Sequence, residues 1–209
     1  MNIFYLDHDP KVCAEMHNDK HCVKMILEYC QLLSTAHRII DGTETMAKSK
    51  TGRNVKRWTL DDERESLLYS ATHINHPSAV WCRINNSNYY WLGSLLSALC
   101  VEYTYRYGKV HKVERDGLAT YLIQIAPRKI PIGSFTQPTP AMPDDVKKLG
   151  DSIASYRNYY IKNKTHLASG CPMPGVDILA PSPNDGVSVM YLSKCGLDAL
   201  KLSYSDIFI

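Results

Sequence analysis

The sequence lacks the features that mark several large classes of protein. No apolar run approaches the ~18 residues that a membrane-spanning helix needs. Asp7, His8 and Asp9 interrupt the N-terminus, so we expect no signal peptide. The chain has no Walker loop, no GxGxxG motif and no GxSxG motif, which argues against the common P-loop, dinucleotide-binding and hydrolase sites. It also has no internal repeats and no low-complexity segment, which argues against a repeat array.

The chain also lacks a large excess of either charge and has no CxxC pair of cysteines. Lys and Arg number 24 against 21 Asp and Glu, and the formal net charge of +3 is well short of that of a protein that coats nucleic acid. The seven cysteines are odd in number and form no CxxC pair, and Cys22 and Cys30 fall in apolar helical surroundings. We therefore expect reduced, mostly buried thiols in a cytosolic protein.

The composition suits a single helical domain, because hydrophobic residues make up 44% of the 209 residues. We predict a mainly α fold: a single globular helical domain over residues 1–168 with four principal helices and minor short strands, followed by a Pro/Gly-rich C-terminal appendage over 169–209. Helix start and stop signals place the four helices at about 9–40 with a break near Asn18–Asp19, 77–107, 112–126, and 144–167 with a jog at Gly150.

Other segments depart from the helical pattern. Residues 2–6 suit a strand or an extended plug, 187–192 suit a strand, and 196–202 suit a short helix. Residues 43–70 form a polar excursion, which we interpret as a solvated loop with one short helix near 60–70; a loop that contacts nucleic acid is the alternative. The excursion opens with a basic run: Lys48, Lys50, Arg53, Lys56 and Arg57.

The most informative segment is His17-Asn18-Asp19-Lys20-His21-Cys22-Val23-Lys24. It places two imidazoles and two ammonium groups close together at the start of a long predicted helix. Because like charges at helical spacing repel one another, such a cluster is typical of a site that holds an anion or moves a proton. We select His17, His21 and Lys24 as candidate catalytic residues and Lys20 as a candidate ligand-binding residue.

A helical wheel separates the polar from the apolar side chains of this segment. The apolar surface covers well over half of the circumference, and His17, Lys20, His21, Lys24 and Glu28 fall within one arc of about 100°. A helix this apolar should be largely buried. Its polar strip is then either a thin solvated edge, in which Glu28 pairs with Lys24, or the wall of a cleft.

Further candidate ligand-binding residues lie outside this helix. His73 and His76 precede the second predicted helix, whose N-terminus attracts anions, although helix capping alone would also explain them. Asn88 lies on an apolar stripe and, if buried, must bond to a neighbouring loop or to a ligand. Residues 102–112 and 156–164 interleave aromatic and basic side chains, as sites that bind nucleic-acid bases do. The ordinary alternative is that the rings cover the edge of the core and the cations favour the ends of helices. From these segments we select Tyr105, Arg106, Arg157 and Tyr160.

A metal site is less consistent with this pattern. His17 and His21 have i,i+4 spacing, and Cys13, Cys22 and His8 are near in the sequence. No second ligand pair has a recognisable spacing, and the two lysines would repel a cation. We therefore predict neither a metal nor a cofactor.

Four segments together resemble a family of unknown function found in tailed bacteriophages and some bacteria. The segments are LDHDPKVCAEMHNDKHCVKMILEYCQLLSTAHR (6–38), THINHPSAVWCRINNSNYYWL (72–92), EYTYRYGKVHK (102–112) and AMPDDVKKLGDSIASYRNYYIKNK (141–164). Residues 43–70 and the tail after 168 depart from the pattern. The resemblance implies a phage-type origin and action in the cytoplasm of an infected bacterium, and it carries over no catalytic residue.

These observations favour a phage-type cytosolic protein that binds or processes a phosphate-bearing nucleotide, or a short single-stranded nucleic acid, in a cleft lined by His, Lys and Tyr. Such a protein would act in nucleotide metabolism or counter-defence, with an imidazole as general acid or base if a reaction occurs. One alternative is a nucleic-acid enzyme of the base-excision glycosylase or lyase type, with Lys20 or Lys24 as an amine nucleophile. The other is an inhibitor that binds a host protein through its basic loop.

Overall fold

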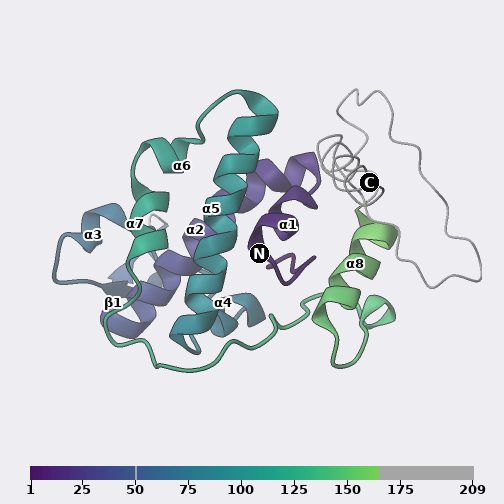
Figure 1. Ribbon diagram of the computed structural model, residues 1–209. Helices are drawn as coiled ribbons and strands as arrows, with labels where there is room; N and C mark the ends of the chain where they lie inside the picture. The colour runs from purple at the N-terminus through teal and green to yellow at the C-terminus, as the bar shows by residue number, and fades with distance from the viewer. Residues whose placement is uncertain (50, 165–209) are drawn as a thin grey trace, which may run out of the picture.

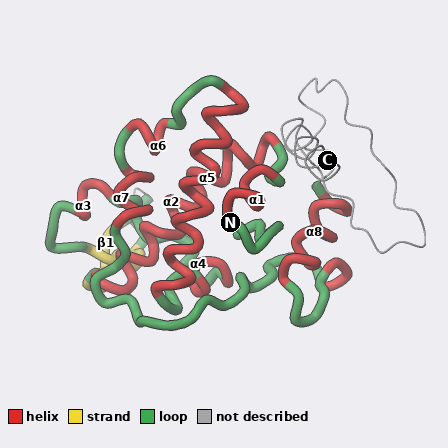
Figure 2. The backbone as a smooth tube through the Cα atoms, in the orientation of Figure 1, coloured by secondary structure: helices red, strands yellow, loops and turns green. Residues whose placement is uncertain are grey.

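Figure 1 shows the computed structural model of the protein, which describes residues 1–49 and 51–164. Within these residues the fold is mainly α, as predicted, with eight α-helices, four of them of seven or more residues, and one two-stranded sheet (Figure 2). The predicted appendage over 169–209, with its strand and short helix, lies outside the described residues. No helix in the described ranges is long and apolar enough to cross a bilayer.

The first predicted helix is divided where the sequence suggests a break. α1 (Pro10–Glu15) starts at a proline and is capped by Asp9, whose carboxylate accepts from two backbone amides of the first turn. α2 (Asp19–Asp41) is capped by Asn18, whose side-chain oxygen accepts from a backbone amide at 2.9 Å. His17 therefore lies between the two helices, and the wheel that placed it on the polar arc of α2 is wrong for this residue.

The two longest helices, α2 and α5 (Asn86–Tyr107), form the centre of the molecule. They pack against each other, and α5 also contacts α1 and α7 (Leu118–Gln124). Figure 1 shows α5 crossing in front of α2 with α1 and α7 beside it. Leucines from both helices are fully buried, for example Leu33 and Leu95. The apolar face of α2 that the wheel predicts is thus the core face of the domain.

Two more predicted helices are interrupted by residues that favour caps and turns. The predicted helix 77–107 is divided into α4 (Pro77–Trp81) and α5, because the side chain of Asn85 caps the first turn of α5 by accepting from a backbone amide at 2.9 Å. The predicted helix 112–126 is divided into α6 (Lys112–Arg115) and α7. Gly117, which separates them, has a left-handed φ of 83° that continues no α-helix.

The last predicted helix starts later than expected. A single 3₁₀ turn, η1 (Asp144–Val146), comes first, and α8 (Ser152–Asn163) follows after Gly150, at a φ of 75°. The Asp151 side chain caps α8 by accepting from a backbone amide at 2.9 Å. The predicted jog at Gly150 is therefore a complete helix break.

The polar excursion contains a β-hairpin that the sequence analysis does not predict. β1 (Thr43–Lys48) pairs antiparallel with β2 (Asn54–Thr59) over six residue pairs. The expectation of a solvated loop is wrong here because both segments carry residues that favour strands, among them Thr43, Thr45, Val55 and Trp58. The expected short helix is present as α3 (Arg64–Leu67).

The N-terminal segment 2–6 is a plug but neither a strand nor extended, because the amides of Tyr5 and Leu6 bond to the carbonyls two residues before them at 2.9 and 3.1 Å. Its residues from Ile3 to Leu6 are buried. The Tyr5 ring packs edge-on against Trp91 of α5, with ring centroids 4.9 Å apart, and the Phe4 ring meets Tyr160 of α8 edge-on at 5.2 Å. The plug therefore joins the helical core to α8, which lies on its far side in Figure 1.

Candidate functional site

The predicted cluster lies where the start of α2 meets the plug and α8. Its two imidazoles differ in surroundings. His17 is 2% exposed, and its Nδ1–H donates to the carbonyl of Cys13 at 2.7 Å. Its Nε2 then accepts from the hydroxyl of Tyr29 at 3.1 Å. Burial lowers the pKa of His17 to about 4, so the ring is neutral at pH 7. Both ring nitrogens are used inside the protein, so His17 supports the site and has no nitrogen left for the catalytic role we expected.

His21 presents a different arrangement of hydrogen bonds. Its ring stacks on Phe4 with centroids 4.1 Å apart. Its Nδ1 lies 2.5 Å from the Tyr160 hydroxyl and 3.3 Å from the side-chain nitrogen of Asn18. Because the Asn18 amide nitrogen can only donate, Nδ1 is the acceptor, and the ring proton of neutral His21 sits on Nε2. Among residues 1–49 and 51–164 no hydrogen bond is made by Nε2, which makes this N–H the candidate donor to a ligand.

The electrostatic surroundings of His21 are positive. Its pKa is lowered to about 3, first by burial and then by His17, Lys164 and Lys24. Lys164, at the end of α8, also lies over the ring of Tyr159, 5.1 Å from its centroid. At pH 7 the charged neighbours are the ammonium groups of Lys164 and Lys24, which would attract an added anion.

The two predicted lysines of α2 are on the surface. Lys20 is exposed. Lys24 has a side chain that is 68% exposed and pairs with Glu28 at 3.0 Å. This pair is the one expected for a solvated edge, so the polar strip of α2 has an ordinary surface character beyond the first turn. His21, Tyr160 and Lys24 are the predicted residues that the fold leaves together at this end of α2, and the exposed Lys20 is adjacent to His21 in the sequence.

The two predicted arginines are structural clamps. Arg106 donates to Glu102 at 2.6 Å, to the carbonyls of Glu15 and His17 at 3.0 and 2.8 Å, and to Asp19 at 3.1 Å. It thereby fixes the α1–α2 turn to α5. With its donors committed to these partners, it is not placed to bind a ligand as we expected.

Arg157 holds the plug in the same way. Its Nε donates to the carbonyl of Leu6 at 2.8 Å, and its NH2 group to Asp7 at 3.1 Å. The guanidinium thus ties α8 to the end of the plug, next to the cap of α1. Its expected ligand-binding role gives way to this structural one.

Asn88 is fully buried and serves the neighbouring loop, the alternative given for it above. Its amide nitrogen donates to the Trp81 carbonyl at 3.1 Å and to the Thr136 hydroxyl at 3.0 Å, and its oxygen accepts from the Thr136 amide at 2.9 Å. Both amide donors of Asn88 are used by these bonds, so none is left for the expected contact with a ligand.

The two imidazoles before α4 lie apart from His21. The Nδ1 of His76 accepts from the amide of Ser78 at 3.2 Å, so it caps α4, as the ordinary alternative predicts. His73 is exposed, has a φ of 49° and bonds to the Thr72 hydroxyl at 2.8 Å. Among the described residues, no hydrogen bond or ring contact joins either imidazole to His21 or Tyr160.

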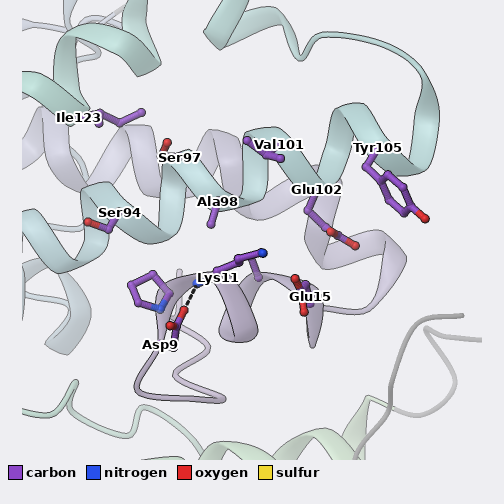
Figure 3. A pocket seen from close by; sticks show the side chains of 12 residues that line it. Asp9, Lys11, Glu15, Ser94, Ser97, Ala98, Val101, Glu102, Tyr105 and Ile123 are labelled. Atoms are coloured by element: carbon purple, nitrogen blue, oxygen red, sulfur yellow. Dashed lines mark hydrogen bonds between the residues drawn. The ribbon is translucent and has the colours of Figure 1, made fainter. Parts of the chain in front are cut away.

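Tyr105 lines a separate cleft between α1 and α5 (Figure 3), with a volume of about 860 Å³. Its charged lining residues are Asp9, Lys11, Glu15 and Glu102, three carboxylates against one ammonium. Phosphate groups would be repelled by this excess of negative charge. The cleft therefore does not serve the predicted nucleotide site, and Tyr105 is separated from the His21 cluster.

A buried ionic network at the other end of α2 escapes the sequence analysis. The Arg64 side chain is 2% exposed and forms ion pairs with Asp41 and Asp62. It also donates to Nδ1 of His37 at 3.2 Å, and Nε2 of His37 lies 2.9 Å from the Tyr89 hydroxyl. Arg64 lies in a run rich in Asp and Glu, which predicts a solvated surface charge, and no sequence signal indicates that it is buried.

The five cysteines of the described residues are free and buried, as predicted for reduced thiols: Cys13, Cys22, Cys30, Cys82 and Cys100. Cys171 and Cys195 lie outside the described ranges. No group of three or more His, Cys, Asp or Glu side chains within those ranges could hold a metal ion.

Comparison with known proteins gives no relative: no family model, no curated protein and no solved structure matches the chain. The phage-type resemblance therefore stays a prediction, and support for a function comes from the residues of the site.

Proposed function

We propose that this chain is a phage-type protein that binds a phosphate-bearing nucleotide at the start of α2, with the Nε2–H of His21 as the central donor. The observation that carries the proposal is a neutral, stacked imidazole whose Nδ1 is held by Tyr160 at 2.5 Å and whose Nε2–H bonds to none of the described residues. A rigidly held donor loses little entropy when it binds an anion.

The charges around His21 support the same ligand. Lys24 of α2 and Lys164 at the end of α8 both act electrostatically on His21. Ammonium groups from two elements can meet the several oxygens of a di- or triphosphate as point charges.

The test is a binding titration with nucleoside mono-, di- and triphosphates against wild type, His21→Phe and Lys24→Ala. Phe keeps the ring stack on Phe4 and removes the Nε2–H donor. We expect a loss of roughly 1.5–3 kcal/mol for this charge-assisted bond, which weakens binding about 10- to 100-fold. Lys24→Ala should weaken binding less, because its ammonium is a mobile surface charge.

Two variants are matched controls for this experiment. Tyr160→Phe removes the same internal hydrogen bond as His21→Phe but leaves Nε2–H in place, so it should retain most of the affinity. Lys112→Ala removes an exposed lysine in an i,i+4 ion pair, as Lys24→Ala does, on a different helix. Failure of every nucleotide to bind, or equal affinity of His21→Phe and wild type, would overturn the proposal.

A further inference from the structure

The hairpin β1–β2 extends from the domain with both of its faces in solvent. Of its twelve strand residues none is buried, and the three that are half-buried are Ala47, Val55 and Trp58. An isolated two-stranded ribbon is marginally stable in water, so an exposed hairpin needs an anchor at its base. Figure 1 places it near the end of α2 opposite to the one where α8 lies.

The anchor is Arg38 of α2, which is 4% exposed. It donates to the Trp58 carbonyl of β2 at 2.9 Å, to Glu65 at 2.6 Å, and to the carbonyls of Leu68 and Tyr69 at 2.8 and 2.6 Å. A guanidinium committed to this many acceptors fixes the base of the hairpin to the helical core. The hairpin is therefore held as an arm, independent of the His21 site.

The charges of this arm are mostly positive and occur on both faces. The described residues 43–49 and 51–59 contain four cations, Lys48, Arg53, Lys56 and Arg57, against one carboxylate, Glu44, which pairs with Lys56 at 2.7 Å. Because successive side chains of a strand point to opposite faces, Arg57 lies on one face while Lys48 and Lys56 lie on the other. Arg53 stands in the turn at the tip.

We propose that hairpin β1–β2 is a DNA-binding arm that enters the major groove of a duplex and contacts phosphates from both of its faces. The major groove is wide enough for a two-stranded β-ribbon, and it is bordered by a phosphate backbone on each side. A ribbon with cations on both faces complements that arrangement of charge. The partner, duplex DNA, goes beyond the nucleotide bound at His21.

The test uses the full chain and a short mixed-sequence duplex, with affinity measured over a range of salt concentrations. The triple variant Lys48→Ala/Arg53→Ala/Arg57→Ala removes exposed cations and no core contact. It should weaken duplex binding at least ~10-fold and reduce the salt slope by roughly 3. The matched control Lys112→Ala/Arg115→Ala/Lys129→Ala removes three exposed cations elsewhere and should bind as wild type does.

Three results would overturn the proposal. One is wild-type binding that is absent or independent of salt, and a second is an equal loss of affinity in both triple variants. The third is preference for another polyanion: a single strand bound more tightly than the duplex, or an acidic peptide that competes at equal charge. Loss of nucleotide binding in His21→Phe leaves the duplex result unchanged, so the two proposals fail separately.

Discussion

Replacing Arg64 with Ala should lower the free energy of unfolding by about 3–5 kcal/mol, the cost of removing one partner from a buried ion pair. The Arg64 guanidinium bonds to Asp62 at 2.8 Å, pairs with Asp41 and donates to His37. Removal of Arg64 leaves the Asp41 carboxylate, 3% exposed, with the backbone amides of Arg128 and Lys129 as its remaining partners. Urea denaturation measures the loss.

The same carboxylate network provides the control for Arg64→Ala. Arg128 pairs with Asp62 at 3.2 Å, but its side chain is 65% exposed. Because exposed ion pairs contribute little, Arg128→Ala should cost less than about 1 kcal/mol. Equal losses in the two variants would show that burial of Arg64 does not govern its contribution.

Acidification should destabilise the protein well before its paired carboxylates become protonated. Burial is the main cause that lowers the pKa of both His17 and His37 from 6.5 to about 4. Below pH 6.5 the unfolded chain binds protons that the folded chain excludes, so stability is complete above 6.5 and falls as the pH approaches 4. Each imidazole accounts for up to about 1.4 kcal/mol per pH unit, or roughly 3 kcal/mol over this window.

Urea denaturation at a series of pH values measures this effect. The pKa of Asp41 is lowered from 3.8, because its hydrogen bonds to Arg64 and to two backbone amides outweigh the effect of burial. The pKa of Glu65 is lowered from 4.5, first by the Leu60 amide. The stability that these carboxylates contribute is therefore lost at a more acidic pH than that of the imidazoles. In His37→Gln the slope between pH 6.5 and 4.5 should become shallower by about one proton. A wild-type stability that stays constant between pH 7 and 5 would contradict neutral burial of these imidazoles.

Local signals predict the helices well where one residue decides the outcome. Asp9-Pro10 starts α1 and Gly108 ends α5, as expected from capping rules. The breaks at Asn85 and Gly117 have equally local causes, but apolar periodicity continues across them and suggests longer helices. The hairpin has only a weak local signal, because its strand-forming residues are interspersed with charged ones without a regular alternation.

The site is harder to predict because tertiary contacts decide which polar groups remain free. The sequence identifies the segment around His21 and the segment of Tyr160, but not that the two meet at 2.5 Å. Arg106 and Arg157 lie in segments whose composition suits ligand binding, yet each donates to a backbone carbonyl far away in the sequence. Phe4, which stacks on His21, carries no sequence signal for this role.

The central claim is that neutral His21 offers Nε2–H to a bound phosphate. Nitrogen-15 NMR of the His21 ring at pH 7 tests this claim most directly, with the spectrum recorded before and after addition of a nucleoside diphosphate. We predict a neutral ring protonated at Nε2, and a shift of the Nε2 resonance on addition of ligand that needs a higher ligand concentration in Lys20→Ala/Lys24→Ala. A ring protonated at Nδ1, or an Nε2 resonance that no nucleotide moves, would contradict the account.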